Sequence, residues 1–444
     1  METLNEIREN LKAHHELFKN GIPLIASENV TSPQCREACN SDFSHRYAEG
    51  VAGQRVYAGC EYIDNIEIMA TDMSKEYFNC KFADVRPISG VVANLAAYTA
   101  VSDPGDKMVC MPIPSGGHIS HAPKKGRKSG RYIGGTAGAV HGLDVHYLKF
   151  DWGEMNLDID ASAKVIREIE PKIVLFGGSV FLFPHPVKEL SEVAKEVGAT
   201  VLYDAAHVLG LIGSGYFQDP LREGADVMMG STHKTFPGPQ HGILLSDIDN
   251  KDLHKDLTKA CFPSMLSNHH LHNVAGLAVT LAEMKEFGKE YHKQVIDNAK
   301  ALAEALHGAG FNVLCKEKGF TESHQVVADI SNFKDTIGLG GDIEEALEKA
   351  GIIINRNLLP WDISKYKRSY KNPGGIRLGT SELTRIGMKE EEMKQVAEFM
   401  KEIVVDQKDA KVVKEKVKKF RDDFQKVHYA FPAETSGYEY IKFD

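Results

Sequence analysis

Two short apolar segments of the chain each lead into a residue that could bind an aldehyde cofactor. Thr200–Tyr203 runs into Asp204, and Val227–Met229 runs into Gly-Ser-Thr-His and then Lys234. Proline and glycine follow the lysine closely, so no helix can continue there and Lys234 should lie on a turn. A lysine amine can form an imine with an aldehyde, and a carboxylate can keep a pyridine nitrogen protonated. The pair suggests pyridoxal phosphate (PLP) as the cofactor.

Each of these residues alone has an ordinary explanation, because a lysine after a strand is usually a surface residue and an aspartate there is usually a helix cap. The pattern of apolar and amphipathic segments around them favours a ligand-binding role. Further apolar segments fall at 108–111, 173–176 and 243–245, and amphipathic segments such as Leu190–Val197 lie between them. Short apolar strands joined by helices predict an α/β fold with a mostly parallel sheet, which binds ligands beyond the carboxyl ends of its strands.

The rest of the chain is expected to form a smaller domain. Asn273–Leu306 has the pattern of a long connecting helix, and strand-like segments follow at 311–314, 324–330 and 375–379. A lysine-rich helix is expected over Lys408–Val427 and a terminal strand over Tyr438–Phe443. We predict an N-terminal arm with a large cofactor-binding domain over residues 1–280, and a smaller α/β domain with a helical tail over residues 281–444.

The composition argues against several classes of protein. The 444 residues are 42% hydrophobic, enough for a sizeable core, and the net charge of −9 argues against nucleic acid as a partner despite the basic loop Lys124–Lys128. No apolar run is long enough to span a membrane, and the charged N-terminus lacks the apolar block of a signal peptide. Seven scattered cysteines indicate reduced thiols, and the histidines lack the spacing of a metal motif. We expect a cytoplasmic protein without a metal centre.

Three further segments could contact a cofactor or substrate, and each also has a structural explanation. Ser89 and Gly90 open a predicted helix whose N–H groups would suit a phosphate, although Ser-Gly is also a plain N-cap. His118 follows two glycines and could stack on a planar ring or simply lie in a loop. Arg377 stands between glycines and could bind a substrate carboxylate or form a structural salt bridge.

Eight motifs occur in a fixed order along the chain. They are LIASENV (24–30), RYAEG (46–50), VYAGCEYID (56–64), ISGVVAN (88–94), SGGHISH (115–121), YDAAHVLGL (203–211), STHKT (231–235) and GIRLGT (375–380). In order and spacing they resemble the serine hydroxymethyltransferase family, over roughly residues 20–400, and the motif variants and helical tail are most similar to its archaeal branch. The resemblance implies a PLP-dependent transferase of fold type I, with a large, mostly parallel, seven-stranded sheet.

The resemblance also implies roles for single residues, in three groups. Those expected around the cofactor are Lys234 as the Schiff-base lysine, Asp204 at the pyridine nitrogen, His118 on the ring, Ser179 and His207 near the cofactor oxygen, and Ser89, Gly90 and His233 at the phosphate. Those expected at the substrate are Arg377 and Ser27, as carboxylate and substrate contacts. Those expected from a neighbouring subunit are Tyr47 at the cofactor, and Glu49 and Tyr57 at the substrate. The site would therefore require a homodimer.

The implied reaction is the reversible conversion of L-serine and a tetrahydropterin into glycine and the methylene-tetrahydropterin, through aldimine chemistry. Glu49 is expected to be the acid–base group, because a carboxyl with a raised pKa can exchange a proton. Two departures leave the carrier open between tetrahydromethanopterin and tetrahydrofolate. Val56 stands where folate-using relatives carry an aromatic residue, and Phe262–His270 reads FPSMLSNHH where the family is usually rich in glycine.

Two other functions remain compatible with these motifs. A threonine or other β-hydroxy amino acid aldolase would use the same lysine without a pterin. A catalytically inactive homologue would act as a binding or scaffold protein, which the presence of Lys234, Asp204, His118 and Arg377 together argues against.

Overall fold

The computed structural model describes residues 2–126 and 132–442, which form two compact units. The larger unit contains residues 34–289, and the smaller contains residues 1–33 and 290–444. Helix α10 (Leu271–Gly308) begins in the larger unit and ends in the smaller one. The expected domains, 1–280 and 281–444, stay a prediction, and the N-terminal residues 1–33 group with the smaller unit of the structure.

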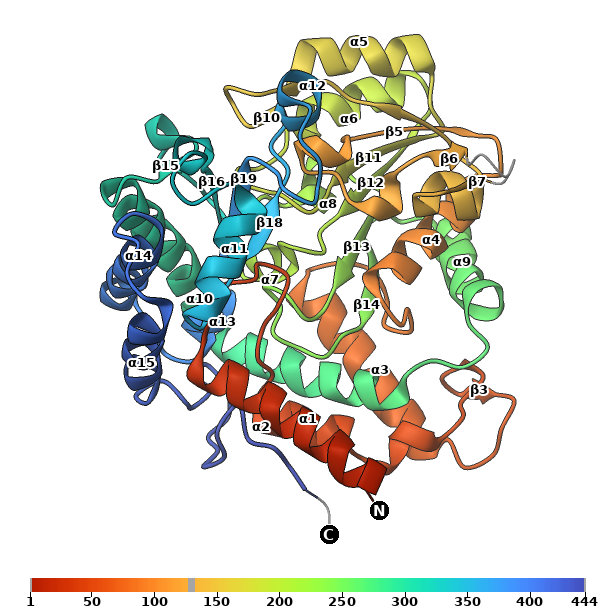
Figure 1. The fold of residues 1–444 in the computed structure, drawn as a ribbon. Coiled ribbons are helices and arrows are strands. Elements are labelled where there is room, and N and C mark those ends of the chain that lie inside the picture. Colours follow the sequence, from red (N-terminus) through yellow and green to blue (C-terminus); the bar gives the residue numbers. More distant parts are fainter. Residues whose placement is uncertain (1, 127–131, 443–444) are drawn as a thin grey trace. The chain divides into compact units, whose positions relative to one another are not determined.

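The larger unit is built on a mixed seven-stranded sheet (Figure 1). In spatial order its strands are β4 (Phe82–Asp84), β14 (Gly242–Ser246), β13 (Val227–Ser231), β12 (Thr200–Asp204), β11 (Ile173–Gly177), β5 (Lys107–Cys110) and β8 (Asp144–Tyr147). The five strands from β13 to β8 are parallel, and β14 runs antiparallel to both its neighbours. The expected α/β fold with a mostly parallel sheet is confirmed.

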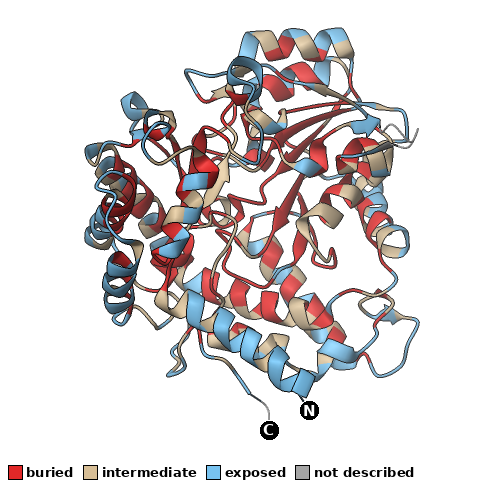
Figure 2. Ribbon diagram, in the orientation of Figure 1, coloured by how far each residue is buried: buried red, intermediate tan, exposed pale blue. Residues whose placement is uncertain are grey.

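The central strands are apolar because helices cover the sheet. Every residue of β11, β13 and β14 is buried, and these strands are red in Figure 2. Helix α4 (Gly90–Val101) packs on β13 and β14, and α6 (Val187–Glu196) packs on β11 and β12. The strands therefore carry no polar alternation, and their polar residues come where the strands end.

The smaller unit contains a four-stranded antiparallel sheet. Its order is β15 (Asn312–Val313), β16 (Gln325–Asp329), β19 (Gly375–Gly379) and β18 (Asn355–Asn357), packed with helices α11 (Gly340–Lys349), α14 (Glu390–Val404) and α15 (Ala410–Arg421). The short strand β1 (Ile22–Pro23) pairs in parallel with β17 (Ile352–Ile353), which joins the N-terminal segment to this unit. The predicted tail helix is confirmed as α15, which is shorter than the expected Lys408–Val427.

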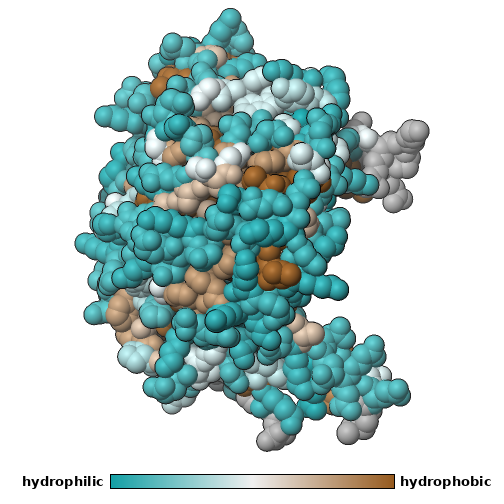
Figure 3. Space-filling model, turned by 60° about the vertical axis from the view of Figure 1, so that its left-hand side comes forward, coloured by the Kyte–Doolittle hydropathy of each residue, from teal (hydrophilic) through white to brown (hydrophobic). Residues whose placement is uncertain are grey.

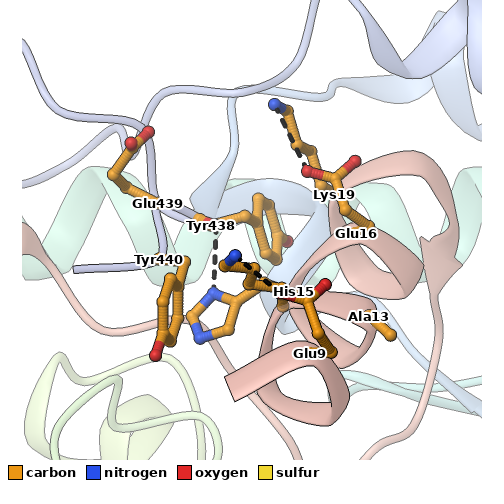
Figure 4. Close-up of a pocket in the computed structure, with 9 residues that line it drawn as sticks. Glu9, Ala13, His15, Glu16, Lys19, Tyr438, Glu439 and Tyr440 are labelled. Carbon is orange, nitrogen blue, oxygen red and sulfur yellow. Dashed lines mark hydrogen bonds and ion pairs between the residues drawn. The ribbon is translucent and has the colours of Figure 1, made fainter. Parts of the chain in front are cut away.

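The C-terminal segment packs through side chains rather than as a strand. Residues 438–442 have no strand pairing, so the predicted terminal strand is wrong in the part of it that is described, and Phe443 lies outside the described residues. The buried Tyr438 donates a hydrogen bond from its hydroxyl to Glu382 Oε1 (2.7 Å), and its carbonyl accepts one from His15 Nδ1 (3.1 Å). Helix α1 (Glu2–Asn20) and residues 438–440 line a hollow of about 500 Å³ (Figure 4).

No helix among the described residues is long and apolar enough to cross a membrane. The face shown in Figure 3 is mostly hydrophilic, with small separate apolar patches. Part of the basic loop forms strand β6 (Lys124–Gly126), which pairs antiparallel with β7 (Tyr132–Gly134), while Arg127 and Lys128 lie outside the described residues.

Candidate active site

Asp204 and Lys234 lie at the same edge of the large sheet. Asp204 is the last residue of β12, and Lys234 follows the end of β13 by three residues. The two strands are adjacent and parallel, with Asp204 in register with Met229, so both residues emerge at the carboxyl edge. Both are more than nine-tenths buried.

The carboxylate of Asp204 accepts hydrogen bonds from three donors. Asn94 Nδ2 and His121 Nε2 each lie 2.8 Å from Oδ2, and the amide N–H of Ala206 lies 3.0 Å from Oδ1. Burial alone would raise the pKa of this carboxyl, but the hydrogen bond from His121, with further contributions from His118 and Asn94, holds it well below its usual range. Asp204 is therefore a fixed, buried anion at neutral pH.

His118 is linked to this carboxylate through a chain of hydrogen bonds. Its Nδ1 lies 2.7 Å from Ser120 Oγ and accepts the Ser120 backbone N–H at 3.2 Å. Ser120 Oγ in turn accepts a hydrogen bond from Asn94 Nδ2 (2.8 Å), the group that also binds Asp204. The ring orientation of His118 is thus set by the residues that hold the anion, and its side chain stays partly exposed.

The loop that carries Lys234 is fixed at both ends. Thr232 donates from its backbone N–H to His241 O (3.1 Å) and from Oγ1 to Pro239 O (2.7 Å), which closes a compact turn around the lysine. Thr235 Oγ1 donates to His207 O (2.8 Å), and this ties the turn to the loop after β12. The lysine is therefore presented on a rigid support, as the pattern of proline and glycine predicts.

The N-terminus of α4 faces the end of β13. Ser89 caps the helix by accepting the Val92 N–H at Oγ (3.2 Å). As in any helix, the N–H groups of the first turn have no intrahelical carbonyl partner. A side chain at Gly90 would place its Cβ 2.2 Å from Ser231 Oγ, so only glycine allows this approach. His233 is partly buried, its Nδ1 has no hydrogen-bond partner among the described residues, and burial lowers its pKa to about 4. These groups form a polar cradle of the kind that binds phosphate.

Ser179 and His207 complete this edge of the sheet. The backbone N–H of Ser179 donates to Gly116 O (2.6 Å), which fastens the loop after β11 to the glycine pair before His118. His207, three residues past Asp204, is buried. The structure thus brings together the eight residues that the sequence assigns to the cofactor from this unit.

A second group flanks the hairpin of β2 (Gly50–Val51) and β3 (Gln54–Arg55), at the periphery of the larger unit in Figure 1. The ring centroids of Tyr47 and Tyr57 are 5.1 Å apart, and Tyr57 is hydrogen-bonded to Glu49. Burial and then the negative charge of Glu49 raise the pKa of Tyr57. Tyr47 and Tyr57 are 44% and 47% exposed, so the group can contact a further partner.

Two side chains that the sequence analysis did not single out hold Tyr47 in place. Asn268 accepts the Ala48 N–H at Oδ1 (3.0 Å) and donates from Nδ2 to Arg46 O (3.2 Å), which grips the backbone on both sides of the tyrosine. Ser267 Oγ is hydrogen-bonded to the Tyr47 hydroxyl. The segment FPSMLSNHH therefore contacts the residues around Tyr47 through the side chains of Ser267 and Asn268, where a glycine-rich segment was expected.

Ser27 and Arg377 lie in the smaller unit, on segments that touch. The N–H of Gly379 donates to Leu24 O (2.8 Å), and a side chain at Gly379 would place its Cβ 2.4 Å from the Cα of Ala26. This close approach brings the segment that ends at Ser27 against β19, which carries Arg377. Arg377 is buried and donates from Nε to Asn355 Oδ1 (3.2 Å), and burial lowers its pKa to about 10, so it remains a cation at neutral pH.

Comparison with known proteins agrees with these motifs. The family described as serine hydroxymethyltransferase matches residues 1–400. The serine hydroxymethyltransferase of Korarchaeum cryptofilum is 56% identical over 440 residues, covering 99% of each chain. Those of Nitrosopumilus maritimus and Methanothermobacter marburgensis are 52% and 53% identical, and each alignment covers at least 97% of either chain.

The chain belongs to the serine hydroxymethyltransferase family. The family consists of PLP-dependent enzymes of fold type I, and the expected similarity to archaeal members is confirmed by these relatives.

The residues of the sheet edge fit PLP. The buried carboxylate of Asp204 can pair with a protonated ring nitrogen, and the amine of Lys234 follows the adjacent strand. The cradle at Ser89, Gly90 and His233 offers donors to a phosphate. His118, His121 and Asp204 also place ligand atoms within 4.8 Å of one another and could hold a metal ion. Hydrogen bonds already engage these side chains, which favours a carboxylate that serves the cofactor, and the expected absence of a metal stays a prediction.

Three residues of this site have no local sequence pattern that indicates their role. Asn94 and His121 are the last residues of two quoted motifs, but they lie 110 and 83 positions from Asp204. Asn268 lies in the segment whose departure from the glycine-rich pattern was noted. Only the fold shows what these side chains contact.

Proposed function

We propose that this enzyme interconverts L-serine and glycine and transfers the hydroxymethyl carbon to a tetrahydropterin. The observation that carries the proposal is the buried Asp204 anion, held by His121 and Asn94 on the strand next to the one that presents Lys234. A charged partner for a pyridine nitrogen beside an amine on a rigid turn is the arrangement that PLP chemistry requires.

We assign the cofactor contacts to one subunit. Lys234 would hold the aldehyde carbon, Asp204 would keep the ring nitrogen protonated, and His118 would lie against the ring. Ser179 and His207 would meet the ring oxygen, and Ser89, Gly90 and His233 would receive the phosphate. PLP, when bound, supplies an electron sink that allows the Cα–Cβ bond of serine to break.

The substrate is recognised by its charge in this proposal. Arg377 would bind the carboxylate of serine through its two parallel N–H donors, and Ser27 would add a hydrogen bond. Because Asn355 already fixes Nε of Arg377 at 3.2 Å, the guanidinium plane is oriented before substrate arrives.

Glu49 and Tyr57 would complete the site from the partner copy, so the functional state would be a homodimer. The exposed position of Tyr47 and Tyr57 beside the hairpin supports this assignment. Glu49 would move the proton of the substrate hydroxyl, with Tyr57 as its hydrogen-bond partner, and Tyr47 would contact the cofactor of the other subunit. The enzyme is proposed to be cytoplasmic.

The pterin could be tetrahydromethanopterin or tetrahydrofolate. Val56, next to Tyr57, is 72% exposed and offers no aromatic ring to the tail of a folate. This departure favours a carrier that does not require stacking at that position.

The test is serine cleavage by the PLP-loaded enzyme with no pterin, with tetrahydrofolate and with tetrahydromethanopterin. We expect one pterin to stimulate glycine formation strongly, with the serine β-carbon recovered on that carrier. Equal rates in all three, with faster cleavage of threonine, would mean that the chain is a β-hydroxy amino acid aldolase. No absorbance from a cofactor imine would mean an inactive binding homologue.

A further inference from the structure

Two cysteines outside the candidate active site share one face of a short helix. Cys35 and Cys39 lie on α2 (Pro33–Cys39), and residues four apart on a helix are neighbours on its surface. Their thiols are hydrogen-bonded to each other. Cys35 is fully buried and Cys39 is partly exposed, so the pair can be reached from the Cys39 side.

Both sulfur atoms meet over a single glycine of α10. A Cβ at Gly276 would lie 2.5 Å from Cys39 Sγ and 3.3 Å from Cys35 Sγ, so any side chain there would displace the sulfurs. Thr280, one turn further along α10, donates to Gly276 O (3.0 Å) and is hydrogen-bonded to Cys35. Glycine in a helix interior is unfavourable by about 0.5–1 kcal/mol relative to alanine, and here its lack of a side chain leaves space for two thiols.

The charge around the pair suits a cation. Glu283 is fully buried on the same face of α10 and its negative charge acts on Cys35. A tetrahedral ion with two thiolates at about 2.3 Å holds them roughly 3.8 Å apart. Two sulfurs that lie 2.5 and 3.3 Å from the Cβ position of Gly276 are close enough to adopt that spacing.

We propose that Cys35 and Cys39 form a two-thiolate site for a soft divalent cation of the zinc group, with water completing the coordination on the Cys39 side. The ion forms two metal–sulfur bonds and both thiol protons pass to the solvent, so no oxidant or reductant takes part. The site is separate from the PLP site and does not depend on the function proposed above.

Cadmium titration of the holoenzyme tests this site, because the ultraviolet sulfur-to-cadmium band reports thiolate ligands and not histidines. The expected result is a band that saturates at one cadmium per chain, is lost in Cys39→Ser and is retained in Cys315→Ser, which changes another partly exposed thiol. A wild-type protein without the band, or a Cys39→Ser variant with an equal band, would overturn the proposal.

A second measurement needs no variant. Cadmium should protect Cys39 from alkylation by iodoacetamide in the wild-type holoenzyme, as read by peptide mass, while Cys315 reacts as before. Equal alkylation of Cys39 with and without cadmium would also overturn the proposal.

Discussion

Replacing His121 by alanine should destabilise the protein through Asp204. The change removes one of three donors to a carboxylate that is about 95% or more buried, while Asn94 and Ala206 keep theirs. A hydrogen bond to a charged group contributes about 1.5–3 kcal/mol, and the space left by the imidazole adds to the loss. We expect the free energy of unfolding at pH 7 to fall by about 3 kcal/mol, and the pKa of Asp204 to rise toward its ordinary value because the carboxylate loses a hydrogen bond.

The measurement is urea denaturation of the apoenzyme, with His146→Ala as the matched control. His146 Nε2 also lies 3.0 Å from a carboxylate, that of Asp144, in the same sheet, but this pair is on the surface. A surface pair contributes only about 0–1 kcal/mol. If His121→Ala lost no more stability than His146→Ala, the conclusion that His121 holds a buried anion would be wrong.

Three further changes test other parts of the account. Glu382→Gln should stabilise the protein by about 3 kcal/mol at pH 8 and little at pH 5 in denaturation curves, because burial raises the pKa of Glu382 from 4.5 to about 7. The folded state then binds a proton that the unfolded state has released, and stability falls as pH rises through that range. Glu402→Gln is the control and should lose stability at pH 8, since lysine partners lower the pKa of Glu402. An equal change in unfolding free energy with pH in the two variants would contradict this interpretation. Asn268→Ala should slow serine cleavage while PLP stays bound, because the segment around Tyr47 loses the two hydrogen bonds from this side chain. Asn268→Asp should retain more activity, since it still accepts the Ala48 N–H. Normal rates in both variants would show that these hydrogen bonds are unnecessary. Lys234→Ala should lower serine turnover by more than about 10³-fold with an unchanged circular dichroism spectrum, and a normal rate would remove the assignment of the cofactor lysine.

The sequence predicts the large sheet and its ligand-binding edge because both depend on local patterns. Short apolar strands are visible as runs, and the residue that ends a run falls at the edge of the sheet, as Asp204 does. The proline and glycine around Lys234 determine a turn without any information from distant residues. The resemblance to the family also points to Tyr47, Glu49 and Tyr57 beside the hairpin, and to Ser27 and Arg377 at the substrate. The roles of these residues stay proposals.

The remaining features depend on contacts between distant segments. His121 and Asn94 reach Asp204 only once strands and helices from three parts of the chain have packed, and nothing in their own neighbours indicates this. The terminal segment has the apolar and aromatic residues of a strand, yet Tyr438 is held by the side chains of Glu382 and Arg421 rather than by a sheet edge. Periodicity cannot distinguish these two ways of burying an aromatic residue.

The most direct test of a site shared between two copies is a hybrid dimer of Lys234→Ala with Glu49→Gln, isolated with two different tags. If Lys234 and Glu49 of different subunits form each site, the hybrid contains one intact site and should cleave serine at about half the wild-type rate, although both parents are nearly inactive. A hybrid no more active than its parents would place both residues in one subunit's site and contradict the account.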